Sequence, residues 1–178
     1  MKRPLFLFAI LLLATGFWLG FSESGLLALT RLASAASGGR LTVEQPSGRL
    51  VGPLGFGRLS WKEPGLVVEV DDLRIEWTPG ALFEKRLVIG ELAAARLRLD
   101  IASSDEASEP PASLILQVAV DIKKMAISRL EYGQVFSAGD LRGVFASDGK
   151  THRLSDFGAR LGLAVIAGSA ELGGSAPL

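Results

Sequence analysis

Apolar residues follow two different patterns along this chain, and the change falls between Gly38 and Arg40. Residues 4–21 read PLFLFAILLLATGFWLGF and carry no charged side chain. As a helix this run would be about 27 Å long, close to the hydrocarbon thickness of a bilayer. From Arg40 onward apolar residues mostly alternate with polar ones, the period of two that is typical of strands. The pattern therefore predicts a membrane-spanning helix followed by a β domain.

Basic residues near this apolar run predict its orientation. Lys2 and Arg3 precede the run, and the next basic residue after it is Arg31. Because basic residues are retained on the cytoplasmic side, the N-terminus should be cytoplasmic and the bulk of the chain periplasmic, with one pass through the inner membrane. The residues expected to contact the bilayer are Leu5, Phe6, Ile10, Leu12, Phe17, Trp18 and Phe21.

A cleaved signal peptide is the alternative interpretation of the same stretch. A signal peptide usually has an apolar core of ~7–15 residues followed by a small-residue cleavage site. Here the run is longer, and it is followed by Phe21, Ser22 and Glu23. The one suitable tripeptide, Ala33-Ser34-Ala35, lies well downstream. We therefore expect residues 1–23 to be an uncleaved transmembrane anchor; with either interpretation the remainder is exported.

Residues 24–39 are expected to form a short membrane-proximal helix. Leu26, Leu29, Ala33 and Ala36 follow one another at helical spacing. Ser24 is the predicted N-cap, and Gly38-Gly39 should end the helix. A continuation of the anchor helix is the alternative.

Residues 40–178 are expected to form a periplasmic β-repeat domain of many short strands. Turn chemistry is found at Glu63-Pro64-Gly65 and at Asp71-Asp72, and Thr78–Glu84 predicts one helical turn capped by Thr78. Residues 103–113 are polar, acidic and rich in proline, which predicts a flexible loop. Because almost no helix is expected after Gly38, a long antiparallel or solenoid-like sheet is favoured over a helix-linked parallel one.

The alternation leaves one face of several predicted strands apolar with no helix to cover it. Such a face must close on itself, pair with another sheet or bind something apolar. In an exported sheet tethered to a membrane, acyl chains are the nearest apolar ligand, so we expect a lipid groove. Its predicted lining residues are Leu73, Ile75, Trp77, Leu97, Leu99, Ile101, Leu116, Val118, Val120 and Ile122. A two-layer sandwich, acting as a tethered interaction or scaffold module without lipid transfer, is the alternative.

Composition argues against catalysis, nucleic-acid binding and metal binding. Lys+Arg and Asp+Glu balance at 19 each, so there is no basic field for nucleic acid. Cysteine is absent, and the single histidine, His152, is predicted to be a surface residue in a polar turn. No nucleophile elbow or phosphate-binding glycine motif is present. We therefore predict no enzyme activity, no catalytic or metal-binding residues and no cofactor.

The order of motifs behind the anchor resembles a known family. Ser24-Gly25-Leu26 and Gly48-Arg49-Leu50 are followed by Leu59-Ser60-Trp61, then by residues 64–68 (PGLVV) and 72–77 (DLRIEW). Leu82-Phe83 then precedes the strand of residues 87–92 and the acidic loop. This order is similar to the N-terminal region of the TamB family, the inner-membrane subunit of the translocation and assembly module, within the wider AsmA-like group. The likeness covers most of residues 1–130.

The resemblance implies a fold, a function and a partner. It implies that the mainly β domain is the start of an elongated antiparallel, gutter-like sheet, a β-taco, with an apolar inner face. It also implies phospholipid transport toward the outer membrane and a part in outer-membrane protein assembly. The expected partners are membrane phospholipid and an outer-membrane β-barrel assembly protein, bound through a C-terminal region that lies outside this sequence. We therefore expect the chain to be the N-terminal part of a longer protein; a terminal strand with a frayed tail is the alternative.

Overall fold

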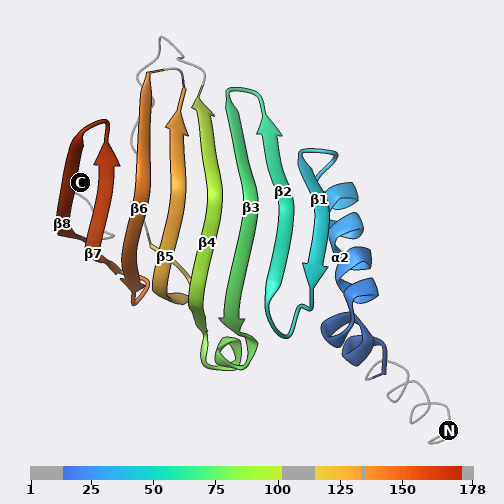
Figure 1. Ribbon diagram of the computed structural model, residues 1–178. Coiled ribbons are helices and arrows are strands. Elements are labelled where there is room, and N and C mark those ends of the chain that lie inside the picture. The colour runs from blue at the N-terminus through green and yellow to red at the C-terminus, as the bar shows by residue number, and fades with distance from the viewer. Residues whose placement is uncertain (1–13, 102–114, 134, 174–178) are drawn as a thin grey trace, which may run out of the picture.

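The described residues form one open sheet flanked by a helix. The computed structural model describes residues 14–101, 115–133 and 135–173. Its strands are β1 (Leu41–Gly48), β2 (Leu54–Glu63), β3 (Leu66–Thr78), β4 (Arg86–Ile101), β5 (Ala119–Tyr132), β6 (Phe136–Ser147), β7 (Thr151–Leu161) and β8 (Ala164–Gly173). They lie side by side in chain order from β1 to β8 (Figure 1). The described part of the chain thus forms the single mainly β sheet that the alternation predicted, and not two layers.

One pair of neighbouring strands departs from the predicted antiparallel pattern. β4 and β5 are parallel, whereas the other neighbouring pairs are antiparallel. A parallel pair requires a connection that returns along the whole strand. That connection is residues 102–118, which include the predicted loop; residues 103–113 themselves lie outside the described residues. The prediction of a wholly antiparallel sheet is therefore wrong at this one pair.

The helix α2 (Glu23–Ala36) lies along the β1 edge of the sheet (Figure 1). Its N-cap is Ser22, whose side chain accepts a hydrogen bond from the Gly25 backbone N–H at 2.9 Å. The predicted cap, Ser24, is instead inside the helix. Gly38 and Gly39 follow the helix with φ of 64° and 82°, conformations that glycine adopts without strain. The helix therefore shields the exposed edge that β1 would otherwise present for pairing.

The predicted anchor is described only in part. Residues 14–21 are helical, and Phe17 and Phe21 stack with ring centroids 4.4 Å apart. The anchor residues Leu5, Phe6, Ile10 and Leu12 lie outside the described residues. Over the ranges that the structure covers, no helix combines the length and the apolarity needed to cross a bilayer.

The helical turn after β3 forms as predicted, but its cap differs. The 3-10 helix η1 (Pro79–Glu84) has Pro79 in its first turn, where the missing N–H costs no hydrogen bond. Thr78 makes no side-chain capping bond. Lys85 ends the turn in the left-handed conformation, with φ of 56°. The predicted turn at Glu63–Gly65 is also present, because β2 ends at Glu63 and β3 begins at Leu66.

A row of irregular residues crosses the sheet. Gln45, Asp72 and Asp140 lie inside strands, yet each has φ of 50°. Gln45 lies opposite Gly57, Gly57 lies opposite Asp72, and Ser128 lies opposite Asp140. The paired residues immediately before and after each of these positions keep the same register. We call this row, completed by Ala95 on β4, the crease. Asp72 therefore lies within β3, and the predicted turn at Asp71-Asp72 is wrong.

The crease changes the phase of side-chain alternation. In β1 the half-buried residues are Leu41 and Val43 on one side of the crease, but Pro46 and Gly48 on the other. A left-handed residue in a strand redirects the side chains that follow it, as in a β-bulge. The two strands approach closely at Gly57, where an added Cβ would lie 2.5 Å from the Gln45 side-chain oxygen and 3.1 Å from the Gln45 Cβ. Because neighbouring strands change the phase of their side-chain alternation at the same row, the register in which they pair is the same on both sides of the crease.

Candidate functional site

Apolar side chains are aligned in rows that run across the strands. Directly paired residues of adjacent strands point to the same face of a sheet. Two rows on the β2–β3 turn side of the crease are Val43, Leu59, Val70, Leu97, Leu130 and Ala138, and then Leu41, Trp61, Val68, Leu99, Tyr132 and Phe136. On the other side, one row is Trp77, Ile89, Ile122, Phe145, Leu154 and Ala170. We call the surface formed by these rows the apolar face.

The phase change at the crease keeps the apolar residues of both halves on one face. In β3, Val68 and Val70 precede Asp72, whereas Leu73, Ile75 and Trp77 follow it. Regular alternation would put these two groups on opposite faces. With one left-handed residue between them, both groups fall on the same face. The apolar face is therefore continuous along the strands as well as across them.

The apolar face has no second layer over it among the described residues. α2 packs on β1, and each strand contacts its neighbours in the sheet. The buried apolar residues of the described chain are Leu26, Ile89, Ala94, Ile127, Ala138 and Ala159, and none of the large side chains is fully buried. Side chains such as Leu97 and Leu99 are only half-buried. A face of this extent without a protein cover is a candidate binding surface for something apolar.

The predicted lining residues fall into two groups. Eight of them lie on strands, at the positions given by the sequence pattern: Leu73, Ile75 and Trp77 on β3, Leu97, Leu99 and Ile101 on β4, and Val120 and Ile122 on β5. Leu116 and Val118 precede β5, which begins at Ala119, so these two predicted lining residues do not lie on a strand. Ile122 is paired with Ile89, which is paired with Trp77, so distant strands contribute to one row.

Other members of the apolar rows were not among the predicted lining residues. They include Leu59, Trp61, Leu130 and Phe145. Their own strands alternate in the same way, so the signal was present in the sequence. What the sequence did not show was which face each short run presents, because that depends on the crease.

The opposite face on one side of the crease carries an ion-pair network. Arg58, Asp71, Arg96 and Arg129 share one row. The Asp71 carboxylate accepts hydrogen bonds from Arg58 Nε at 2.8 Å and from Arg96 Nε at 2.8 Å. The hydrogen bond from Arg58, followed by that from Arg96, lowers the pKa of Asp71, while the same contact raises the pKa of Arg58. The carboxylate is thus ionised at neutral pH, and the charged face differs sharply from the apolar one.

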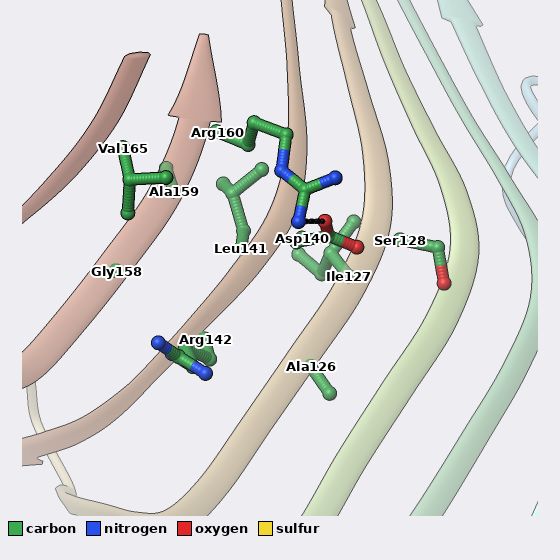
Figure 2. A pocket seen from close by; sticks show the side chains of 10 residues that line it. All are labelled: Ala126, Ile127, Ser128, Asp140, Leu141, Arg142, Gly158, Ala159, Arg160 and Val165. Carbon is green, nitrogen blue, oxygen red and sulfur yellow. Dashed lines mark ion pairs between the residues drawn. The ribbon is translucent and has the colours of Figure 1, made fainter. Parts of the chain in front are cut away.

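An open hollow of about 480 Å³ lies over β5 to β8 at the crease (Figure 2). Its lining includes apolar Ile127, Leu141 and Ala159, and Asp140 and Arg160 form an ion pair across it at 3.1 Å. The Arg142 guanidinium lies against Gly158, where its Nε would be 3.0 Å from an added Cβ. The hollow thus combines apolar side chains with charged ones, a combination that suits an amphipathic ligand better than a purely polar one.

His152 does not lie in a turn, as the sequence predicted, but on β7. Its Nδ1 is 2.8 Å from the Ser147 hydroxyl, and its ring is stacked on Phe145 with centroids 6.3 Å apart. The same hydroxyl accepts a hydrogen bond from the Gly149 backbone N–H. These contacts give the imidazole a structural role at the β6–β7 turn.

Comparison with known proteins agrees with this architecture. No curated protein and no solved structure matches the chain. A family model does: residues 11–151 match the one described as TamB, N-terminal domain. The match covers most of the chain, including the segment before α2 and the strands from β1 to β6. The chain therefore belongs to the TamB family.

Proposed function

We propose that this chain is an inner-membrane-anchored protein of the cell envelope that binds phospholipid on the apolar face of its sheet. The observation that carries the proposal is the continuous, uncovered apolar face over β1 to β8. Acyl chains are flexible and lie along a surface of aliphatic and aromatic side chains without needing specific polar partners. Binding, and not catalysis, is the activity that such a surface supports.

Membership of the TamB family supports the more specific parts of the proposal, which concern membrane topology, lipid transport and outer-membrane protein assembly. The run from Pro4 to Phe21 crosses the inner membrane once, with the N-terminus in the cytoplasm and the sheet in the periplasm. The sheet is the beginning of a gutter-like conduit that carries phospholipid toward the outer membrane. Outer-membrane protein assembly with a β-barrel partner is the second process that the conduit serves. Neither process requires a cofactor or a metal.

Photo-crosslinking tests lipid binding on the apolar face. A photoreactive amino acid at Leu99 should capture phospholipid in membranes, because Leu99 lies in an apolar row between Val68 and Tyr132. The same amino acid at Arg98, the neighbouring position on the opposite face, is the matched control and should capture little. Captured lipid is identified by mass spectrometry of the purified adduct. Equal capture at both positions would contradict a lipid-selective face.

A tethered interaction module without lipid transfer is the second candidate, and one observation favours it. β8 is the last strand of the described sheet and every one of its residues is exposed, so a strand of a partner could pair with its outer side. Purified chain with no extractable phospholipid, together with a partner that protects the backbone amides of β8 from hydrogen exchange, would favour this candidate over the lipid conduit.

A further inference from the structure

Two consecutive apolar side chains project from η1 and have no role in folding the sheet. Phe83 is 95% exposed and Leu82 is 45% exposed. None of the residues of η1 is buried. An exposed phenylalanine contributes little to the stability of the sheet, so Phe83 is available for an external contact.

Two hydrogen bonds, made through the β1–β2 loop, connect the strand that precedes η1 to the helical segment of residues 14–21. The Val51 backbone N–H donates to the Gly20 carbonyl oxygen at 2.9 Å, which fastens the β1–β2 loop to residues 14–21. The Trp77 indole N–H donates to the Leu50 carbonyl oxygen at 2.9 Å, which fastens the same loop to the end of β3. η1 follows β3 directly. Helical segment, loop and η1 therefore form one rim of the sheet, as Figure 1 shows.

The exposed side chains of the helical segment at this rim are those that favour a bilayer. Phe17 is 65% exposed, Trp18 45% and Phe21 46%. Aromatic rings of this kind are enriched at membrane–water interfaces. Lys85, which is exposed, follows the η1 tip and would face anionic headgroups, whereas Arg86 beside it is ion-paired with Asp121.

Apolar side chains at the opposite end of the sheet are exposed as well. Val135, in the β5–β6 turn, is 96% exposed, and Leu163, in the β7–β8 turn, is fully exposed. Exposure alone therefore does not select η1. Position does: η1 lies at the end of the sheet where the β1–β2 loop is hydrogen-bonded both to Gly20 and to Trp77, and β4, with 16 residues, places the other end roughly 50 Å away.

We propose that Leu82 and Phe83 of η1 insert into the bilayer interface as a second membrane contact, beside the N-terminal helix. With two contacts instead of one, the sheet cannot swivel about its anchor, and the strands are held upright on the membrane. The inference rests on the proposed function, because it requires the N-terminal segment to be in the bilayer.

Site-directed spin labelling tests the inference directly, since the chain has no native cysteine. Single cysteines replace Phe83, Val135 and Trp18 in separate variants of the full chain, which is reconstituted into vesicles of phosphatidylethanolamine and phosphatidylglycerol. Collision of each nitroxide with oxygen and with a water-soluble nickel chelate is then measured. Phe83 and Val135 are matched, because both are almost fully exposed in a connection between strands.

The expected result is that oxygen collisions exceed nickel collisions at positions 18 and 83, and that nickel collisions dominate at position 135. A lipid-facing label at 18 with a water-facing label at 83 would overturn the inference and leave the proposed function intact. A water-facing label at 18 would overturn both. Shielding of position 83 from both reagents would overturn the inference in favour of a protein contact.

A charge substitution gives a second readout that does not depend on labelling Phe83 itself. With the nitroxide on a cysteine at Leu82, Phe83→Asp should return the label to water and reverse the ratio of oxygen to nickel collisions. With the nitroxide on a cysteine at Phe136, Val135→Asp should leave that ratio unchanged. An unchanged ratio in the Phe83→Asp variant would also overturn the inference.

Discussion

Leu99→Arg is expected to strip phospholipid from the purified chain while leaving the sheet folded. Leu99 lies on β4, half-buried between Val68 and Tyr132, and the described residues place no second layer above it. A guanidinium at this position can reach water, so the free energy of unfolding should change by less than about 1 kcal/mol. In a closed sandwich the same change would leave an unpaired buried charge and cost about 3–5 kcal/mol.

The same substitution should act strongly on lipid. An arginine among acyl chains costs about 3 kcal/mol, which corresponds to a roughly 100-fold loss of affinity. Phospholipid per chain is measured by mass spectrometry after purification in mild detergent, and folding is followed by circular dichroism during urea denaturation. Leu99→Met, which keeps the volume and the apolarity of the side chain, is the control and should retain its lipid.

Two results would count against the apolar face as a lipid site. Leu99→Arg chain that retains as much phospholipid as Leu99→Met would show that lipid binds elsewhere. Cooperative unfolding of the arginine variant at much lower urea would show that the face is covered by protein in solution.

Trp77→Ala is expected to produce the second large effect, a loss of stability. Trp77 combines an apolar ring on the apolar face with an indole N–H that holds the β1–β2 loop through Leu50. Truncating a buried tryptophan costs about 3–5 kcal/mol, and since Trp77 is only half-buried we expect about 2–3 kcal/mol. Urea denaturation of the full chain, followed by circular dichroism, measures this loss.

Trp77→Phe separates the ring from its hydrogen bond. Phenylalanine keeps most of the apolar contact but cannot donate to the Leu50 carbonyl, so the expected loss of stability is about 1 kcal/mol. The phospholipid content of this variant should equal that of the wild type. A free energy of unfolding equal to that of the wild type would contradict the role assigned to the hydrogen bond between Trp77 and Leu50.

The local elements could be predicted because their signals are local. Pro79 begins a helical turn, and Pro64-Gly65 connects two strands, since proline fixes φ and Gly65 has φ of 84°. Asp72 shows where the same reasoning fails. Aspartate tolerates the left-handed conformation, which makes it common in turns, but here it takes that conformation within β3. The preference of aspartate for the left-handed conformation was predicted correctly, but the placement of Asp72 in a turn was wrong.

The pairing of β4 with β5 could not be predicted from alternation. Each strand has the same period of two whether its neighbour is parallel or antiparallel, so the pattern carries no information about direction. β4 ends at Ile101 and β5 begins at Ala119, and the polar composition of residues 103–113 predicts a connection but not the end of the sheet to which it leads. The lining residues on β3 and β4 were predicted because each short run alternates regularly. The crease, which puts separate runs on one face, depends on neighbouring strands and does not show in the alternation of one strand.

The continuity of the apolar face across the crease is the central claim, and β3 allows it to be tested directly. Val70 and Leu73 are three residues apart, so a regular strand would put them on opposite faces, whereas the left-handed Asp72 puts them on one. Photoreactive amino acids at Val70 and Leu73 should both capture phospholipid in membranes, and those at Asp71 and Arg74 should capture little. Capture that follows strict alternation, with Leu73 like Asp71 and unlike Val70, or no capture at either apolar position, would contradict the account.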